Sequence, residues 1–185
     1  MARWEPDARG RLQQAAMELF RDRGYADVTV AEIADRAGLT KRTFFNHFAD
    51  KREVFFANAQ MFEEDVLAQL AGADPALSPI DAAVLAVTRA GLKLAPYYEY
   101  AKARNAVLAV TPELRERDLV KSDRLARAMA GELVRRGAPE RNAVFAAEAA
   151  LAVFALAAAD WIAEPTADLP GFMQRALTDL RDAVG

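Results

Sequence analysis

Apolar residues recur at helical spacing along the whole chain, and no stretch shows the strict alternation of a half-buried strand. The first clear helical face ends before Gly24, and glycine adopts the left-handed conformation of a helix C-cap without steric cost. This face is formed by Leu12, Ala15, Ala16, Leu19 and Phe20. The pattern predicts an all-α fold.

Two short helices are predicted next, with a tight turn between them. Thr29 with Glu32 three residues later forms a capping box that begins the first of them. Gly38 ends that helix, and Thr40 is a suitable N-cap for the next. The apolar positions of the pair are Val30, Ile33, Ala34, Ala37, Phe44 and Phe48. This spacing is typical of a helix-turn-helix, in which glycine permits the reversal and Leu39 fills the angle between the helices.

The remainder of the chain divides at prolines and glycines. A longer helical pattern runs from Asp50 to about Leu70, and 71–79 is the clearest linker. Further helices are predicted near 79–95, 97–109, 112–136, 139–163 and 168–183. We therefore expect about nine helices in two domains: a helix-turn-helix domain over 1–50, and a second helical domain over 51–185.

Composition narrows the function classes. The 185 residues are 53% hydrophobic, which is enough for a sizeable core, and contain no cysteine and one histidine, His47. Disulfides, thiolate catalysis and Cys- or His-based metal sites are thereby disfavoured, so we expect no enzyme, metal or cofactor. The N-terminus has no apolar run, and the longest one, 149–159, is shorter than the roughly 20 residues that span a bilayer. A cytoplasmic protein without a membrane partner is expected.

Charge is distributed unevenly although the net charge is only −3. Residues 1–60 carry 10 Lys/Arg against 9 Asp/Glu, a balance of +1, which leaves 14 against 18, or −4, for 61–185. Within 40–52, four basic side chains accompany Asp50 alone. Such a local basic cluster is what a small DNA-contacting surface requires.

The second helix of the motif has the composition of a recognition helix. Between its core aromatics it presents Lys41, Arg42, Thr43, Asn46 and His47. Side chains of these types can hydrogen-bond to base edges in a major groove about 12 Å wide. His47 lies beside core positions, so a half-buried structural role competes with a phosphate contact, and Phe45 could belong to the core or to the DNA surface.

The segment from Thr29 to Lys51, and more broadly residues 9–56, resembles the signature of the TetR family of transcriptional regulators. Two departures stand out: Phe45 replaces a frequent phosphate-binding tyrosine, and Arg42 replaces a common glycine. The resemblance implies that Lys51 binds a phosphate. It also implies that Thr29 and Thr40 contact phosphates through their hydroxyls or through helix N-terminal amides. The DNA-facing residues that it implies are Lys41, Arg42, Thr43, Phe45, Asn46 and His47.

The C-terminal helices suggest self-association. The segment 143–159 is apolar nearly all round, with Glu148 its only charge. The last helix carries a second apolar stripe of Phe172, Ala176, Leu180 and Val184. Helices 139–163 and 168–183 of two protomers could form a four-helix bundle. The resemblance implies that homodimer, reading a pseudo-palindromic site, whereas the alternative is that both helices close a monomeric core.

The resemblance also implies a small-molecule pocket among the central helices. Aromatic walls with a few polar groups suit a ligand, although plain core packing is the alternative for each residue. The candidates are Phe62, Tyr97, Tyr98, Tyr100, Asn105 and Met129, with Trp161 further on. The leading hypothesis is a transcriptional repressor that binds duplex DNA. An unknown apolar or aromatic ligand would release this repressor from the DNA. An architectural DNA-binding protein without an effector is the second reading, and a helical-bundle enzyme is a disfavoured third.

Overall fold

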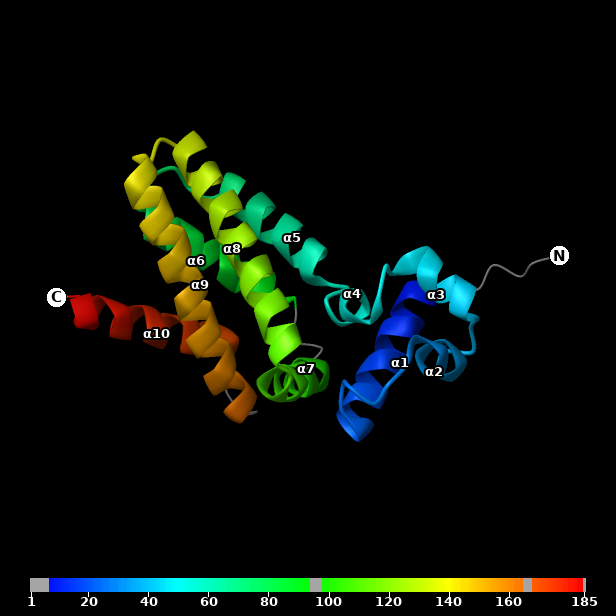
Figure 1. Cartoon of the computed structure of the whole chain (residues 1–185). Coiled ribbons are helices and arrows are strands. Elements are labelled where there is room, and N and C mark those ends of the chain that lie inside the picture. Colours follow the sequence, from blue (N-terminus) through cyan, green and yellow to red (C-terminus); the bar gives the residue numbers. More distant parts are fainter. Residues whose placement is uncertain (1–6, 94–97, 165–167, 185) are drawn as a thin grey trace. The chain divides into compact units, whose positions relative to one another are not determined.

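The computed structural model describes residues 7–93, 98–164 and 168–184. Within these residues the regular structure is entirely α-helical, which confirms the predicted fold class (Figure 1). The helices are α1 Ala8–Arg23, α2 Val30–Arg36, α3 Lys41–His47, α4 Lys51–Phe55, α5 Ala59–Ala71, α6 Pro79–Leu92, α7 Tyr98–Val110, α8 Pro112–Arg135, α9 Glu140–Ala163 and α10 Leu169–Val184.

The described residues form ten helices where the sequence suggested nine, because the single helix expected between Asp50 and Leu70 is broken. It ends at Phe55 and begins again at Ala59, with a turn between. A helix end leaves carbonyl groups without an intrahelical partner. Here the carbonyl of Ala57 accepts a 2.8 Å hydrogen bond from the guanidinium of Arg9 on α1. That long-range contact has no local sequence signal.

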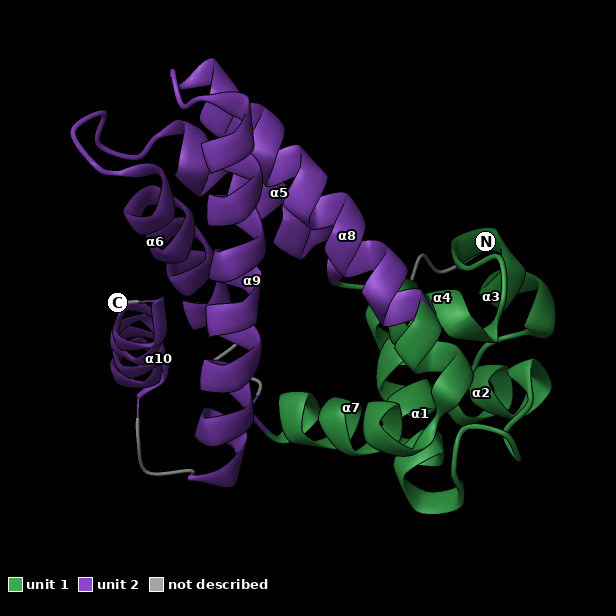
Figure 2. Ribbon diagram, turned by 60° about the vertical axis from the view of Figure 1, so that its left-hand side comes forward, with its two compact units in different colours: residues 1–58, 99–116 green, residues 59–98, 117–185 purple. Residues whose placement is uncertain are grey.

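The chain divides into two compact units that differ from the expected division at residue 50 (Figure 2). Unit 1 comprises Met1–Asn58 and Glu99–Glu116, and unit 2 comprises Ala59–Tyr98 and Arg117–Gly185. Unit 1 therefore extends through α4 and includes most of α7 together with the first turn of α8. Two consecutive segments could not represent this arrangement, because the segment 99–116 packs with residues far earlier in the chain.

Unit 1 is organised around α1, which packs against α2, α3 and α4, while α2 packs against α3. Its core is aromatic and aliphatic, with Leu12, Phe20, Ile33, Phe44, Val54 and Phe55 among the most deeply buried side chains. Side-chain contacts of Tyr100 and Arg104 join α7 to this group. The side-chain amide of Gln13 donates to the hydroxyl of Tyr100 at 2.7 Å, and the guanidinium of Arg104 lies 5.2 Å from the centre of the Phe55 ring.

Unit 2 is a helical bundle in which α9 packs against α6 and α10, and α6 also contacts α5 and α10. The guanidinium of Arg136, just past the end of α8, donates to the carbonyls of Leu70 and Ala73 at 3.1 and 2.8 Å. These bonds attach α8 to the C-terminal end of α5. An ion pair between Arg181 and Asp81, with 2.5 Å between nitrogen and oxygen, joins α10 to α6.

Helix α9 matches the predicted range 139–163, but its apolar part is longer than the run 149–159. Its 24 residues include an 18-residue window of mean hydropathy 1.8, so by length and composition alone it could cross a membrane. The apolar length expected from 149–159 was too short, because it included only the uninterrupted run of apolar residues. Core helices pass the same test, and one face of α9 is buried against α6 and α10.

Candidate DNA-binding surface

The capping box predicted at the start of α2 is present. The backbone amide of Glu32 donates to the hydroxyl of Thr29 at 3.3 Å, and the amide of Thr29 donates back to the Glu32 carboxylate at 2.8 Å. The Thr29 hydroxyl also donates to that carboxylate at 2.7 Å, and Arg23 approaches its other oxygen at 2.7 Å. These bonds hold the pKa of Glu32 at about 2, well below its usual range.

The turn between α2 and α3 has the predicted glycine geometry. Gly38 has φ +67°, in the left-handed region that disfavours residues with a Cβ atom. The amide of Leu39 returns to the carbonyl of Ala34 at 2.8 Å, closing the end of α2. Thr40 then caps α3, since its hydroxyl accepts the amide of Thr43 at 3.1 Å. The reversal therefore places α3 directly after α2.

Helix α3 divides into a buried and an exposed face. Phe44 and Phe48 are buried, as the apolar spacing predicted. The side chains that the sequence analysis assigned to DNA lie on the other positions of this helix: Lys41, Arg42, Phe45, Asn46 and His47 are exposed, and Thr43 is half-buried. Phe45 and His47, whose positions were open in the sequence, therefore both lie on the surface. The aromatic core anchors the helix while its polar side chains face outward.

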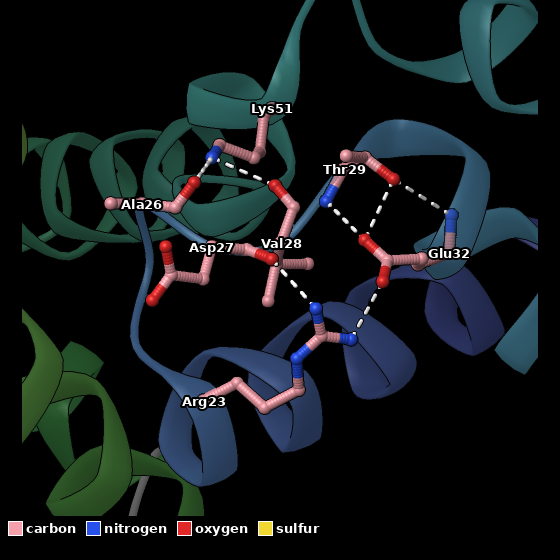
Figure 3. Close-up of polar contacts among 7 residues, drawn as sticks. All are labelled: Arg23, Ala26, Asp27, Val28, Thr29, Glu32 and Lys51. Atoms are coloured by element: carbon pink, nitrogen blue, oxygen red, sulfur yellow. Dashed lines mark hydrogen bonds and ion pairs between the residues drawn. The ribbon is translucent and has the colours of Figure 1, made fainter.

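The side chain of Lys51 contacts the backbone of the loop between α1 and α2. Its ammonium donates to the carbonyl of Tyr25 at 2.6 Å. It also donates to the carbonyl of Val28 at 2.8 Å and approaches that of Ala26 at 3.4 Å (Figure 3). Burial lowers the pKa of Lys51 from its ordinary value. An ammonium has three N–H donors, and here they face three backbone carbonyls. This arrangement supports a role in holding the loop between α1 and α2 rather than a phosphate contact.

Tyr25 links the same loop to the first turn of α8. Its hydroxyl hydrogen-bonds to the carboxylate of Glu113, and burial followed by this carboxylate raises the pKa of Tyr25 above its ordinary value. Both residues belong to unit 1. The sequence does not predict this contact, because Tyr25 and Glu113 are far apart in the chain and neither belongs to a motif.

The residues proposed to line a ligand pocket are divided between the two units. In unit 2, the Phe62 ring lies 5.5 Å from that of Phe154, and Met129 is fully buried. Tyr98 donates to the carbonyl of Ile162 at 2.7 Å. Two others, Asn105 and Tyr100, belong to unit 1. Asn105 is exposed. The hydroxyl of Tyr100 accepts the hydrogen bond from Gln13, and burial raises the pKa of Tyr100. Tyr97 lies outside the described residues. Helical spacing could not separate pocket walls from ordinary core.

The curated relatives match part of the chain. The transcriptional activator FasR of Mycolicibacterium smegmatis is 41% identical over 61 residues, covering 33% of this chain and 28% of FasR. The transcriptional regulator TcmR of Streptomyces glaucescens is 40% identical over 89 residues, covering 45% of this chain and 39% of TcmR. Both are described as HTH-type. The chain thus aligns with well under half the length of each relative.

Solved structures match over nearly the whole chain. SmeT, the repressor of a Stenotrophomonas maltophilia multidrug efflux pump, solved with triclosan, is 20% identical with a TM-score of 0.64, covering 93% of this chain and 90% of SmeT. FadR of Thermus thermophilus, a TetR-family repressor solved with lauroyl-CoA, is 24% identical with a TM-score of 0.57, covering 92% and 91%. At these identities the likeness shows the fold.

The resemblance predicted for residues 9–56 is confirmed by a family model. The model described as bacterial regulatory proteins, tetR family, matches residues 12–57, which include α1 to α4 from Leu12 onward. The capped helices, the glycine turn and the exposed polar face of α3 all lie within this span. Residues 12–57 are therefore similar to the N-terminal domain of bacterial regulatory proteins of the tetR family.

Proposed function

We propose that the chain is a sequence-specific transcriptional repressor that binds duplex DNA. The exposed face of α3 is the observation that supports this proposal most directly. Lys41 and Arg42 can donate to guanine or phosphate, and Asn46 can pair with adenine. Their helix is anchored by Phe44 and capped by Thr40, so the polar side chains are held on a fixed backbone.

Selection from a random duplex pool tests this proposal, with affinity followed against salt concentration. We expect an inverted repeat whose binding falls strongly in Lys41→Ala, Arg42→Ala and Asn46→Ala variants. Each lost phosphate contact lowers the salt slope by about 0.9, whereas each lost base contact costs about 1–3 kcal/mol and relaxes the selected sequence. Arg127→Ala is the control, because Arg127 is an exposed arginine of α8 outside the motif.

Weak binding without sequence preference would contradict the proposal. The architectural DNA-binding alternative would then lead, since backbone contacts alone supply salt-sensitive, nonspecific affinity. The relative FasR is an activator, which favours activation as a second candidate for the regulatory outcome. A reporter gene placed behind the selected site separates the two, because expression falls with a repressor and rises with an activator.

We further propose that the chain acts as a homodimer through the exposed face of α9. Phe145 and Leu156 on this face are 64% and 65% exposed, although both are large and apolar. The stripe predicted on α10 contributes less than expected, since Phe172 and Ala176 are buried within the chain and only its end, Val184, is exposed. A two-fold dimer presents two copies of α3, one for each half of an inverted repeat.

The proposed effector is a small apolar or aromatic molecule that dissociates the repressor from DNA. Triclosan in SmeT is a small aromatic ligand, and lauroyl-CoA in FadR carries an apolar acyl chain. In this chain, Phe62 and Met129 of unit 2 are the strongest lining candidates, because both lie within its apolar packing. A ligand shifts the population off DNA only if it binds the released conformation more tightly.

Titration of the protein–operator complex with triclosan and with lauroyl-CoA provides the first test. We expect at least one probe to weaken operator binding and raise the melting temperature of the free protein. A Met129→Ala variant should alter the ligand response while operator affinity without ligand is retained. Operator binding that is unaffected by either probe, with no thermal shift, would favour a regulator without an effector of this class.

A further inference from the structure

The ring of Phe45 is an apolar surface within an otherwise polar helix face. It is 49% exposed, whereas its neighbour Phe44 is fully buried. Single exposed apolar residues are common on proteins and need no special explanation. Here, however, the ring lies on the helix that we propose enters the major groove, among side chains that can form hydrogen bonds.

The orientation of this ring is set by its neighbours. Phe45 lies edge-on to Phe44, with 5.5 Å between the ring centres and 83° between the ring planes. Because Phe44 is fully buried, it provides a fixed support for the exposed ring. The ammonium of Lys41, one turn earlier, lies 6.0 Å from the centre of the Phe45 ring. A cation and an apolar ring are therefore side by side on the exposed face.

A phenyl ring can make only one kind of favourable contact with the base edges of a major groove. It offers no hydrogen bond, so against guanine, adenine or cytosine it would cover donors and acceptors without satisfying them. Thymine presents a C5-methyl group, an apolar surface of matching chemistry. Lys41 beside the ring can meanwhile donate to a neighbouring guanine or phosphate.

We propose that Phe45 is a specificity-determining residue that contacts the C5-methyl group of a pyrimidine, normally thymine, in each half-site. This inference rests on the proposed DNA-binding function. It predicts that the half-site contains a position at which the methyl group, rather than the pairing pattern of the base, is recognised. The neighbouring Asn46 reads hydrogen-bonding groups and should be indifferent to that methyl group.

Replacing each thymine of the selected operator in turn by deoxyuridine tests the proposal, since this removes the methyl group and keeps the base pair. At one position per half-site we expect affinity to fall about fourfold, the effect of one buried methyl group. The loss should disappear in Phe45→Ala, as a double-mutant cycle requires, and persist in Asn46→Ala. Phe45→Leu, which keeps a smaller apolar surface, should retain part of it.

A second arm separates the methyl group from the identity of the base. Placing cytosine at the sensitive position weakens binding, and 5-methylcytosine should recover about fourfold of that loss with the wild-type protein only. Sensitivity to deoxyuridine that is unchanged in Phe45→Ala, or a lack of methyl sensitivity at every thymine, would overturn the role of Phe45 while leaving the regulator proposal intact. Failure to select any specific operator would instead contradict the proposed function itself.

Discussion

The ammonium of Lys51 lies 2.6 Å from the backbone carbonyl oxygen of Tyr25 and 4.1 Å from the centre of the Tyr25 ring. The same ammonium donates to the carbonyl of Val28, the residue immediately before the N-cap Thr29 (Figure 3). Lys51, at the start of α4, therefore holds the loop that leads into α2. This geometry favours a positioning role, with consequences for both stability and DNA binding.

Substitution Lys51→Met is expected to lower the free energy of unfolding by about 2 kcal/mol, because hydrogen bonds from a charged donor are lost and carbonyls are left without a partner. Operator affinity should fall as the loop before α2 loosens, but the salt slope should be unchanged. Lys41→Ala provides the contrast, with stability close to wild type and a salt slope lower by about 1. Thermal melts and salt titrations of binding measure both effects.

The opposite pattern would return Lys51 to the phosphate-binding role that the family resemblance implied. That pattern is a Lys51→Met variant with an unchanged melting temperature and a salt slope reduced by about 1. Measurements below the melting transition are needed for the comparison, so that the fraction of folded protein does not enter the apparent affinity.

Glu32 should make folding sensitive to acid. Its pKa in the folded protein is about 2, below the ordinary value of 4.5, because Thr29 and Arg23 hydrogen-bond to the carboxylate. A depressed pKa contributes stability that is fully present above the unfolded value and is lost as pH falls from about 4.5 toward 2. In Glu32→Gln the decline of the melting temperature over this pH range should be shallower.

Glu116→Gln is the matched control, since Glu116 is an exposed glutamate of α8. Its melting temperature should follow the wild-type pH profile more closely than that of Glu32→Gln. Identical slopes for the two variants below pH 5 would show that the capping box contributes nothing to the acid sensitivity.

Features that depend on neighbouring residues could be predicted from the sequence. The capping box of Thr29, the N-cap of Thr40 and the turn at Gly38 follow from side-chain chemistry within a few residues, and all three are present. The burial of Phe44 and Phe48 followed equally from helical spacing.

Features that depend on distant residues could not be predicted. The break before Ala59 is supported by Arg9, and the ammonium of Lys51 is held by carbonyls more than 20 residues away. Similarly, Tyr100 is an aromatic residue of the kind that lines ligand pockets, yet its hydroxyl accepts a hydrogen bond from Gln13 of α1. Periodicity assigns such residues to a buried face but does not say which helix covers that face.

Gly38 and Gly131 should respond in opposite directions to substitution by alanine. At Gly38, with φ +67°, a side chain costs roughly 1–2 kcal/mol of backbone strain, and a Cβ atom would lie 2.8 Å from the guanidinium of Arg11. Gly131 is exposed within α8, and nothing lies within 4 Å of a Cβ atom there. Alanine at that position should stabilise the protein by about 0.5–1 kcal/mol.

Urea unfolding of the two variants measures this contrast directly. Because Gly38 lies between α2 and α3, Gly38→Ala should also weaken operator binding, whereas Gly131→Ala should not. Equal effects of both substitutions on unfolding would mean that the left-handed backbone at Gly38 does not constrain the turn.

The exposed apolar face of α9 is expected to mediate self-association. Buried residues of this helix face α6 and α10, while Phe145 and Leu156 project from its other side. Burying this face against a second copy would remove a large apolar surface from water, and a carboxylate placed there would oppose the association. Phe145→Asp and Leu156→Asp are therefore expected to convert the dimer into a folded monomer.

Sedimentation velocity at micromolar protein concentration distinguishes the two states. The matched control is Val110→Asp, because Val110 is 79% exposed but lies at the end of α7. It should remain dimeric and bind the operator as the wild type does. The α9 variants should bind an inverted repeat much more weakly, and no better than a single half-site, because a monomer presents one α3 where the dimer presents two. Dimers that persist in both α9 variants would place the interface elsewhere on the molecule.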